Sequence, residues 1–321
     1  MKKLIIALLA GLLIATPSLA EEKPTIRLGV LAFGTVNWEL TALKNEIKTP
    51  SFNLDIRRLT SPQAGKIALQ SGAVDMIVAD WVWVSRQREN NFNFTFYPYS
   101  TASGRLMVSP KSTIRSVNDL IGKKLGIAGG ALDKNWLLLQ TLSQRSGLTL
   151  KENLEPVFGA PPLLSQQLKQ GQLDAVMTYW HYGAKLEALG FRSLLSGSDI
   201  ISGLGIEQKI PMLGYVFQQD FASQHPTVIT RFFSTLALAK EQLCLNDASW
   251  QKIIPLTKAN DQKTAQLLRQ RYCDGRIKQW GPAEHDGAEK IYTLLKALSN
   301  NRLTGQSEHI NPGTFWMPSA P

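Results

Sequence analysis

The hydrophobic pattern of the chain alternates between strand-like and helix-like segments. Short apolar runs at residues 26–31 and 125–128 predict buried strands, because each run is short and continuous. A glycine-bearing turn and a helical pattern follow each run. Second apolar runs then stand at residues 76–79 and 175–178. Strands that alternate with helices predict an α/β fold with mostly parallel, helix-covered sheets.

The pattern of the first half returns about a hundred residues later. The segment LQSGAVDMIVADWVW, which starts at Leu69, aligns without a gap on LKQGQLDAVMTYWHY, which starts at Leu168. Earlier in each half, LGV is followed by Trp38 and LGI by Trp136 at similar spacing. Two echoes in the same order predict two α/β lobes of similar construction.

Prolines and glycines mark the expected starts and ends of helices at matching positions in the two halves. We expect helices that start near Pro62 and Pro162, since proline suits the first helical position. We expect these helices to end at Gly72 and Gly171, where a left-handed C-cap fits.

Two segments, 100–109 and 211–217, are interpreted as crossings between the lobes. Long helical patterns follow the second crossing, at residues 226–245, 261–272 and 282–298. The last twenty residues are rich in Asn, Gly and Pro, which is typical of a surface tail.

Four tryptophans take equivalent places in the two halves. Trp81 and Trp180 follow the ends of matching strands, and Trp38 and Trp136 stand at the starts of matching helices. Ligands bind at this edge of open α/β sheets. We therefore expect the four indoles to face one cleft between the lobes, rather than only to pack locally.

The N-terminus has the features of an export signal. Two lysines precede an apolar core at residues 4–14, and small residues precede the end of the segment at Ala20. We predict a signal peptide over residues 1–20, cleaved after Ala20, and a periplasmic protein. The composition of the full 321-residue chain, with 44% hydrophobic and 19% charged residues, is that of an ordinary globular protein.

The net charge bears on the kind of ligand, and the cysteine content bears on the redox state of the protein. The formal net charge of +10 suits anionic ligands, although it also suits an anionic membrane surface. Cys244 and Cys273 are the only cysteines. In an oxidising periplasm they could form a disulfide, or they could remain two buried free thiols.

The sequence lacks the motifs of the common enzyme classes. It contains no HExxH, GxSxG, GxxxxGK[ST] or GxGxxG segment, and its four histidines are scattered. Basic residues are interspersed with acidic ones, which argues against nucleic-acid binding. We predict a binding protein without catalytic residues, metal or catalytic cofactor. The alternatives are a periplasmic enzyme in which His181 acts as acid or base, and a sensor domain that signals through a separate partner chain.

Four segments give the chain a family resemblance. LQSGAVDMIVAD, SVNDLIGKKLGIAGG, LKQGQLDAVMTYW and HPTVITRFFSTLALAKEQL resemble, in this order, the sulfonate-, taurine-, nitrate- and thiamine-precursor-binding proteins of ABC importers. The resemblance implies a type II periplasmic binding protein fold: lobe 1 from residues 21–102 and 212–299, lobe 2 from 103–211, and a C-terminal tail, 300–321. It also implies a monomer that closes on a solute and is recognised by a membrane permease.

The resemblance also implies a set of cleft residues, in the turns that match the family's ligand positions. One departure is Ala131, which stands where sulfonate and taurine binders often have a serine that contacts an oxyanion. Backbone N–H groups at this helix start, together with Lys134, could hold an anion instead. The candidate ligand-binding residues are Asn37, Trp38, Asp80, Trp81, Ser103, Gly129, Gly130, Lys134, Trp136, Tyr179, Trp180 and His181.

The aromatic content bears on the choice of ligand. Four indoles with Tyr179 and Tyr182 favour a flat conjugated ligand over taurine or nitrate, because aromatic rings stack on one another. VADWVWVSRQR, GGALDKNWLLL, VFGAPPLL and IPMLGYVF also resemble a subgroup associated with alcohol oxidation that depends on pyrroloquinoline quinone (PQQ). We therefore expect PQQ, a planar tricarboxylate, as the transported ligand. The alternatives are an aliphatic or aromatic sulfonate, a thiamine-precursor pyrimidine, and a cation held by indoles with Asp80 as its counter-charge.

Overall fold

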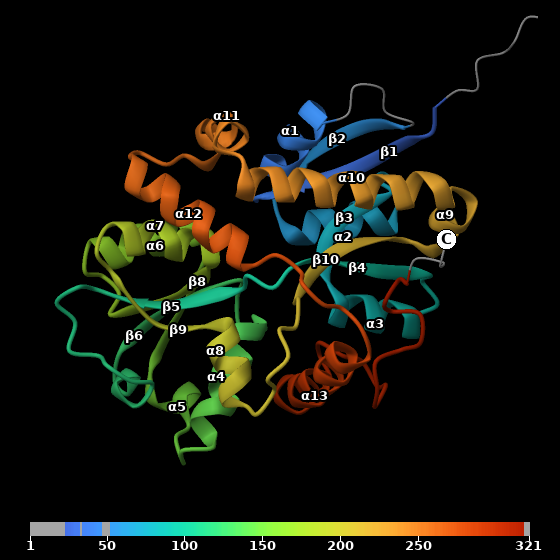
Figure 1. Ribbon diagram of the computed structural model, residues 1–321. Coiled ribbons are helices and arrows are strands. Elements are labelled where there is room, and N and C mark those ends of the chain that lie inside the picture. Colours follow the sequence, from blue (N-terminus) through green and yellow to red (C-terminus); the bar gives the residue numbers. More distant parts are fainter. Residues whose placement is uncertain (1–22, 33, 47–51, 318–321) are drawn as a thin grey trace, which may run out of the picture.

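The computed structural model describes residues 23–32, 34–46 and 52–317. The chain folds into two α/β lobes, one above the other in the view of Figure 1. The predicted signal peptide, residues 1–20, lies outside the described residues. Among the described helices, none is both long and apolar enough to cross a membrane.

Lobe 1 is built on a five-stranded sheet with the order β2-β1-β3-β10-β4. Strand β1 pairs in parallel with β2 and β3, whereas β10 runs antiparallel to β3 and β4. The strands are β1 (Thr25–Leu31), β2 (Asn53–Leu59), β3 (Met76–Asp80), β4 (Phe94–Ser100) and β10 (Leu213–Gln218).

Lobe 2 repeats this arrangement with the order β7-β6-β8-β5-β9. Strand β5 runs antiparallel to β8 and β9, and so takes the place that β10 takes in lobe 1. The strands are β5 (Gly104–Val108), β6 (Lys124–Ala128), β7 (Glu155–Gly159), β8 (Ala175–Tyr179) and β9 (Arg192–Ser196). The predicted pair of similar α/β lobes is thereby confirmed.

Helices cover both sheets. Lobe 1 holds α1 (Val36–Glu46), α2 (Pro62–Gln70), α3 (Trp81–Glu89), α9 (Gln219–Gln224), α10 (Pro226–Leu245) and α11 (Asp247–Thr257). Lobe 2 holds α4 (Lys134–Gln144), α5 (Leu150–Asn153), α6 (Pro161–Lys169), α7 (Trp180–Ala188) and α8 (Gly197–Gly203), with a short 3₁₀ turn at Asn118–Leu120. The last two helices are α12 (Gln262–Asp274) and α13 (Pro282–Ser299).

The two matching aspartates of the sequence repeat, Asp75 and Asp174, make the same hydrogen bond in both lobes. Asp75 accepts a hydrogen bond from the backbone N–H of Arg27 at 2.8 Å, and Asp174 accepts one from the N–H of Lys124 at 2.8 Å. Each carboxylate thus ties the turn before β3 or β8 to the start of the neighbouring strand.

The predicted helix ends agree with the structure. Gly72 and Gly171 follow α2 and α6 with φ of 72° and 73°, in the left-handed region that favours glycine. Helix α6 begins at Pro161, one residue before the expected proline.

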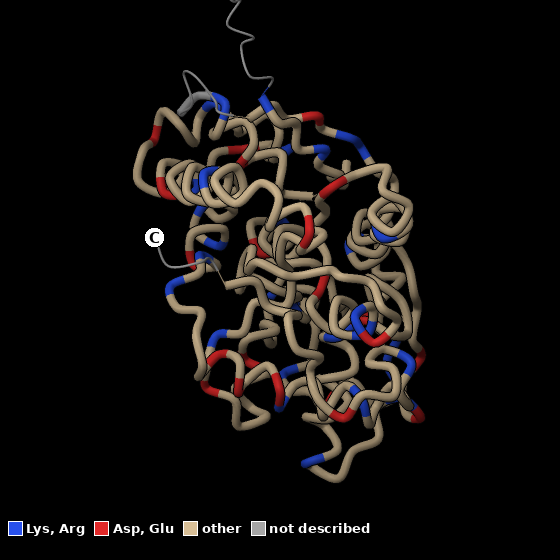
Figure 2. The backbone as a smooth tube through the Cα atoms, turned by 90° about the vertical axis from the view of Figure 1, so that its right-hand side faces the viewer, with Lys and Arg blue, Asp and Glu red and all other residues tan. Residues whose placement is uncertain are grey.

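The chain passes between the lobes twice, between β4 and β5 and between α8 and β10. After the second passage, α12 packs against α7 and α13 packs against α4, so both C-terminal helices contact lobe 2 (Figure 1). Figure 2 shows basic and acidic residues interspersed along the chain in both lobes.

Residues 300–317 follow α13 and attach to β4, an edge strand of lobe 1. The N–H of Phe96 donates to the Thr314 carbonyl at 2.8 Å, and the N–H of Trp316 donates to the Phe96 carbonyl at 2.8 Å. Phe315 packs edge-on against Trp81 and Phe96. This part of the predicted tail is therefore bonded along the outer edge of the sheet.

Candidate functional site between the lobes

The starts of four helices meet where the two lobes face each other. Helices α1 and α3 of lobe 1, and α4 and α7 of lobe 2, each begin just after the C-terminal end of a strand. The start of α3 contacts the start of α4 through an ion pair, and the start of α1 contacts the start of α7 through aromatic rings. This is the sheet edge at which ligands bind in such folds.

The first contact is an ion cluster centred on Asp80. This residue caps α3, since its Oδ1 accepts from the N–H of Trp83 at 2.8 Å. Its Oδ2 lies 3.1 Å from Nζ of Lys134, in lobe 2, and 3.3 Å from Nζ of Lys66, on α2 of lobe 1. Lys66 also stands over the Trp83 ring at 5.0 Å. The structure thus brings together Asp80 and Lys134 and adds a lysine that the sequence analysis does not single out.

The ion cluster carries more positive than negative charge. Burial alone would raise the pKa of Asp80, but the ammonium groups of Lys134 and Lys66 outweigh burial and hold that pKa well below its usual range. Burial lowers the pKa of Lys66, and Asp80 only partly offsets this effect. Within the ion cluster, one carboxylate therefore faces two ammonium groups, an excess of one positive charge, and the carboxyl group of Asp133 lies close to Lys134.

The second contact is an aromatic cluster formed by Trp38, Trp180, Trp250 and Tyr272. The Trp38 ring centroid lies 5.9 Å from that of Trp180 across the lobes, and 5.9 Å from that of Trp250. Tyr272 lies 6.0 Å from Trp38 and 6.4 Å from Trp180. Trp250 and Tyr272 come from α11 and α12, which the sequence repeat does not include. Among the residues that the structure describes, the indole N–H of Trp250 has no hydrogen-bond partner, although Trp250 is only 3% exposed.

The other two predicted tryptophans lie in the hydrophobic core. Trp81 is fully buried, and its indole N–H donates to the Pro211 carbonyl at 3.1 Å. Trp136 is also buried, in the core that continues to α13. Of the four indoles predicted to face one cleft, the structure therefore places Trp38 and Trp180 in contact across the lobes. The ring of Trp81 is covered by protein.

The turn before α4 contains two glycines, Gly129 and Gly130, in backbone conformations that favour glycine. Gly129 and Gly130 have φ of 105° and 88°, which L side chains rarely adopt. Asp133 then caps α4 by accepting from the N–H of Trp136 at 3.1 Å, and burial raises the pKa of Asp133.

Burial, aided by the charge of Asp133, raises the pKa of Tyr179 to about 12. Neutral Tyr179 can therefore donate a hydrogen bond over the physiological range.

The remaining predicted residues lie around this junction. His181 is buried on α7, with its ring 5.4 Å from Trp180 and 4.7 Å from Tyr182. Asn37 is half-buried on α1 beside Trp38. Ser103 stands in the first passage between the lobes, where a Cβ added to Gly197 would lie 1.9 Å from its Oγ. The start of α8 therefore sits closely against Ser103.

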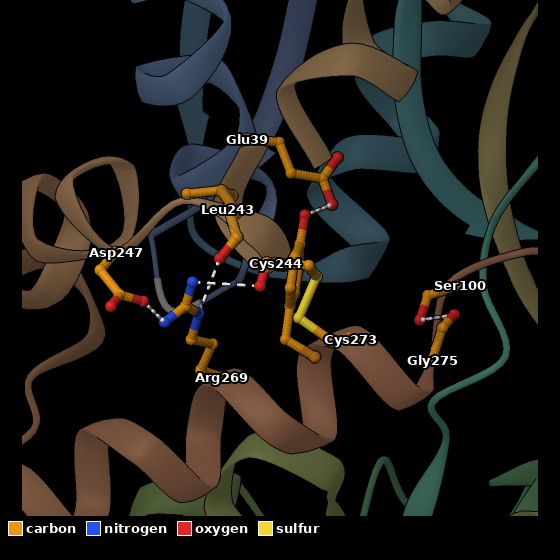
Figure 3. Close-up of a disulfide and its surroundings, with 9 residues drawn as sticks. Glu39, Ser100, Leu243, Cys244, Asp247, Arg269, Cys273 and Gly275 are labelled. Carbon is orange, nitrogen blue, oxygen red and sulfur yellow. Dashed lines mark hydrogen bonds and ion pairs between the residues drawn. A yellow bond between two sulfur atoms is a disulfide. The ribbon is translucent and has the colours of Figure 1, made fainter. Parts of the chain in front are cut away.

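Cys244 and Cys273 form a disulfide that joins the ends of α10 and α12 (Figure 3). Of the two possibilities that the sequence leaves open, a disulfide or two free thiols, the structure contains the disulfide.

Two cavities open elsewhere on the surface. One, of about 460 Å³, lies between β4, α9 and the end of the chain, and the other, of about 400 Å³, lies between β4, α10 and residues 276–278. Neither is lined by a residue of the predicted set. At the lobe junction, side chains of the two lobes meet through the Asp80–Lys134 ion pair and the rings of Trp38 and Trp180. Within the described ranges, no group of three or more His, Cys, Asp or Glu residues could hold a metal ion.

A family profile described as NMT1/THI5 like matches residues 53–244, which is more than half of the chain. The chain belongs to the NMT1/THI5-like family. The match spans the ion cluster, the glycine turn, the sheet of lobe 2 and the strands of lobe 1 other than β1, and it ends at Cys244. Helices α11 and α12, which carry Trp250 and Tyr272, lie beyond the matched part of this NMT1/THI5-like chain.

Solved structures of similar fold cover nearly the whole NMT1/THI5-like chain. The alkanesulfonate-binding protein SsuA from Xanthomonas axonopodis pv. citri, bound to MOPS, is 17% identical with a TM-score of 0.68, over 92% of this chain and 99% of that one. The aliphatic sulphonate binding protein SsuA from Escherichia coli is 19% identical with a TM-score of 0.67, over 92% of each chain. The ligand binding component of an ABC-type import system from Staphylococcus aureus, with zinc bound, is 15% identical with a TM-score of 0.68, over 92% and 97%. These likenesses establish the predicted type II periplasmic binding protein fold.

A comparison with curated protein sequences gave no match.

Proposed function

We propose that this NMT1/THI5-like protein is the periplasmic solute-binding component of an ABC importer, and that it captures a small planar anionic aromatic ligand by closure of its lobes. The observation that carries the proposal is the lobe junction. There, an ion cluster with excess positive charge and an aromatic cluster are both assembled from the two lobes. A ligand that contacts both lobes stabilises the closed form, which a permease can recognise.

The ion cluster favours an anion over a cation. Asp80 already faces Lys66 and Lys134, so it has little charge left to offer a cationic ligand. A carboxylate or sulfonate of the ligand would instead share the two ammonium groups. The neighbouring indoles suit a flat ring system, because stacked rings add roughly 0.5–1.5 kcal/mol beyond their buried area.

PQQ combines these features, since it is planar and carries three carboxylates. An alkanesulfonate is the second candidate, because the similar SsuA structure from Xanthomonas axonopodis pv. citri holds MOPS. A thiamine-precursor pyrimidine is a further alternative in the same cleft. In each case the protein binds the solute without converting it, needs no catalytic cofactor, acts as a monomer and delivers the ligand to a membrane permease.

Tryptophan-fluorescence titration of the mature protein tests the proposal. PQQ, taurine, MOPS and benzenesulfonate are titrated separately, and calorimetry excludes absorbance artefacts. We expect saturable binding of PQQ, with Trp38, Trp180 and Trp250 as the reporters at the junction. Saturation by MOPS or benzenesulfonate alone would replace PQQ with a sulfonate. Chemical conversion of any bound compound would contradict the assignment as a carrier.

A further inference from the structure

Helix α12 lies between the two lobes. The chain has already returned to lobe 1 before this helix, yet α12 packs along α7 of lobe 2 (Figure 1). Residues 271–275, at the end of α12, are bonded to lobe 1, to lobe 2 and to the first passage between them. A change in the relative orientation of the two lobes would therefore strain or break contacts at the end of this helix.

The bonds to lobe 1 are a disulfide between two half-buried cysteines and hydrogen bonds. Cys273 forms the disulfide with Cys244 at the end of α10, and Arg269 donates to the Cys244 carbonyl at 3.0 Å (Figure 3). Between them, the hydroxyl of Tyr272 donates to Oε1 of buried Glu39, on α1, at 2.9 Å. Burial raises the pKa of Glu39, and Lys240 and the tyrosine hydroxyl groups partly offset that rise. The end of α12 is thus fixed to two helices of lobe 1.

The residue after α12 contacts the passage between the lobes. The carbonyl of Gly275 accepts from the N–H of Thr101 at 2.9 Å and from Oγ of Ser100 at 3.0 Å. A Cβ added to Gly275 would lie 2.6 Å from Cβ of Ala102, so the two segments fit closely. Movement at the passage would therefore disturb the end of α12.

The bond to lobe 2 is an ion pair with two points of contact. Arg271 donates from Nη2 to Oε1 of Glu187, on α7, at 2.5 Å, and from Nε to Oε2 at 3.3 Å. Both side chains are about one-quarter exposed. Arg105 of lobe 2 lies near enough that its pKa is lowered by burial and, further, by the charge of Arg271. Glu187 therefore also counters the repulsion between these two arginines.

We propose that Arg271 and Glu187 are positioning residues for lobe closure, and that the Cys244–Cys273 disulfide keeps Arg271 in reach of lobe 2. The inference rests on the proposed function, in which closure captures the solute. Neither residue needs to touch the ligand. Their pair adds to the contacts at the four helix starts, so the closed form is favoured before any solute arrives.

The test measures closure in the ligand-free protein. Dyes are attached through unnatural amino acids at exposed Arg58 of lobe 1 and Lys151 of lobe 2, and single-molecule energy transfer gives the ratio of closed to open molecules. We expect Glu187→Gln to lower this ratio roughly fivefold, because a two-point ion pair is lost and two arginines are left facing each other. Asp274→Asn is the matched control. It removes a contact with Arg271, at 3.6 Å, that stays within α12.

The disulfide is tested in the same assay. The double variant Cys244→Ala/Cys273→Ala should lower the closed-to-open ratio while the melting curve still shows a cooperative transition. Combining it with Glu187→Gln should add little, because both changes act through Arg271.

Several results would overturn the inference. These are an unchanged ratio in Glu187→Gln, an equal change in Asp274→Asn, or an open wild-type protein whose distribution does not depend on Glu187. Failure of the proposed function has a different signature, since none of the titrated solutes would bind while the ratio still responds to Glu187. The two ideas can therefore fail separately.

Discussion

At the scale of single residues, the proposed preference for an anionic solute rests on Asp80 and its two lysines. Lys134 reaches Asp80 from lobe 2, whereas Lys66 reaches it from lobe 1. In the ligand-free protein, Asp80 is the acidic partner of both. An entering anion can take part of this role without a new charge being buried alone.

We therefore expect Lys66→Gln to weaken PQQ binding about tenfold, because one charge-assisted hydrogen bond to a carboxylate is worth roughly 1.5–3 kcal/mol when retained. Calorimetric titration measures the change. Lys169→Gln, at an exposed lysine near the end of α6, serves as the control. Equal affinity in the two variants would show that the anion does not use Lys66.

The pH dependence of binding follows from the same residue. Burial lowers the pKa of Lys66 below its ordinary value of 10.5, so the ammonium group is lost earlier on the alkaline side. Only the charged form attracts an anion, and PQQ affinity should therefore fall as the pH rises through this lowered pKa. Lys66→Arg keeps its charge throughout and should flatten the fall. A wild-type profile that stays flat up to pH 10.5 would contradict this account.

Two tryptophans that the sequence treats alike should behave differently. The sequence pattern predicts a cost of at least about 1 kcal/mol in ligand affinity for both Trp81→Ala and Trp180→Ala. The structure keeps that expectation for Trp180, at the junction. For Trp81, whose ring is fully buried in protein, it replaces the affinity cost with a loss of about 3–5 kcal/mol in unfolding free energy. Thermal melts and PQQ titrations separate the two effects, and unchanged affinity in both variants would refute an aromatic contact with the ligand.

The sequence repeat could predict part of this junction and not the rest. Asp80 and Trp180 stand at the ends of strands, and Trp38 and Lys134 stand in the first turns of the helices that follow matching strands. Lys66 lies in the middle of α2, at a position that looks like an ordinary solvated lysine until the fold turns it towards Asp80. Trp250 and Tyr272 come from helices without a counterpart in lobe 2.

At the scale of elements, the strands and helix ends were predictable because local chemistry determines them. Residues 226–245 form α10 as expected, and proline and glycine mark the ends of α2. Helix α11 was not foreseen, and Pro255 in its last turn weakens the helical pattern there. The packing of α12 and α13 on lobe 2 depends on the three-dimensional return of the chain, which periodicity alone does not encode.

The disulfide should stabilise the elements that it joins. It closes a loop over a sequence separation of 29 residues, for which chain entropy gives about 3–4 kcal/mol. We expect a thiol reductant to lower the melting temperature by roughly 5 °C in a chain of this length. The variant Cys244→Ala/Cys273→Ala should melt at the lowered temperature with or without reductant. An unshifted melt, with two thiols titrated in the oxidised native protein, would rule out the bond in solution.

At the scale of the whole molecule, the two lobes are held together in this structure by pairs on different sides of the junction. Lys134 and Asp80 join α4 to α3, Trp180 and Trp38 join α7 to α1, and Glu187 with Arg271 adds α12. In the proposed mode of binding, a solute must therefore enter while these contacts are open and restore them, or replace them, on closure. The energy that it contributes is the difference between its own contacts and those it displaces.

The C-terminal segment along β4 has a consequence for how separate molecules meet. An edge strand offers unpaired N–H and C=O groups to any other strand, and here residues 314–316 occupy those of Phe96. Deletion of residues 300–321 should uncover this edge together with the ring of Phe96. We expect the shortened protein to form oligomers or precipitate at concentrations where the full chain elutes as a single small species in size-exclusion chromatography. On this expectation, residues 314–316 keep the edge strand of one molecule from pairing with the edge strand of another copy.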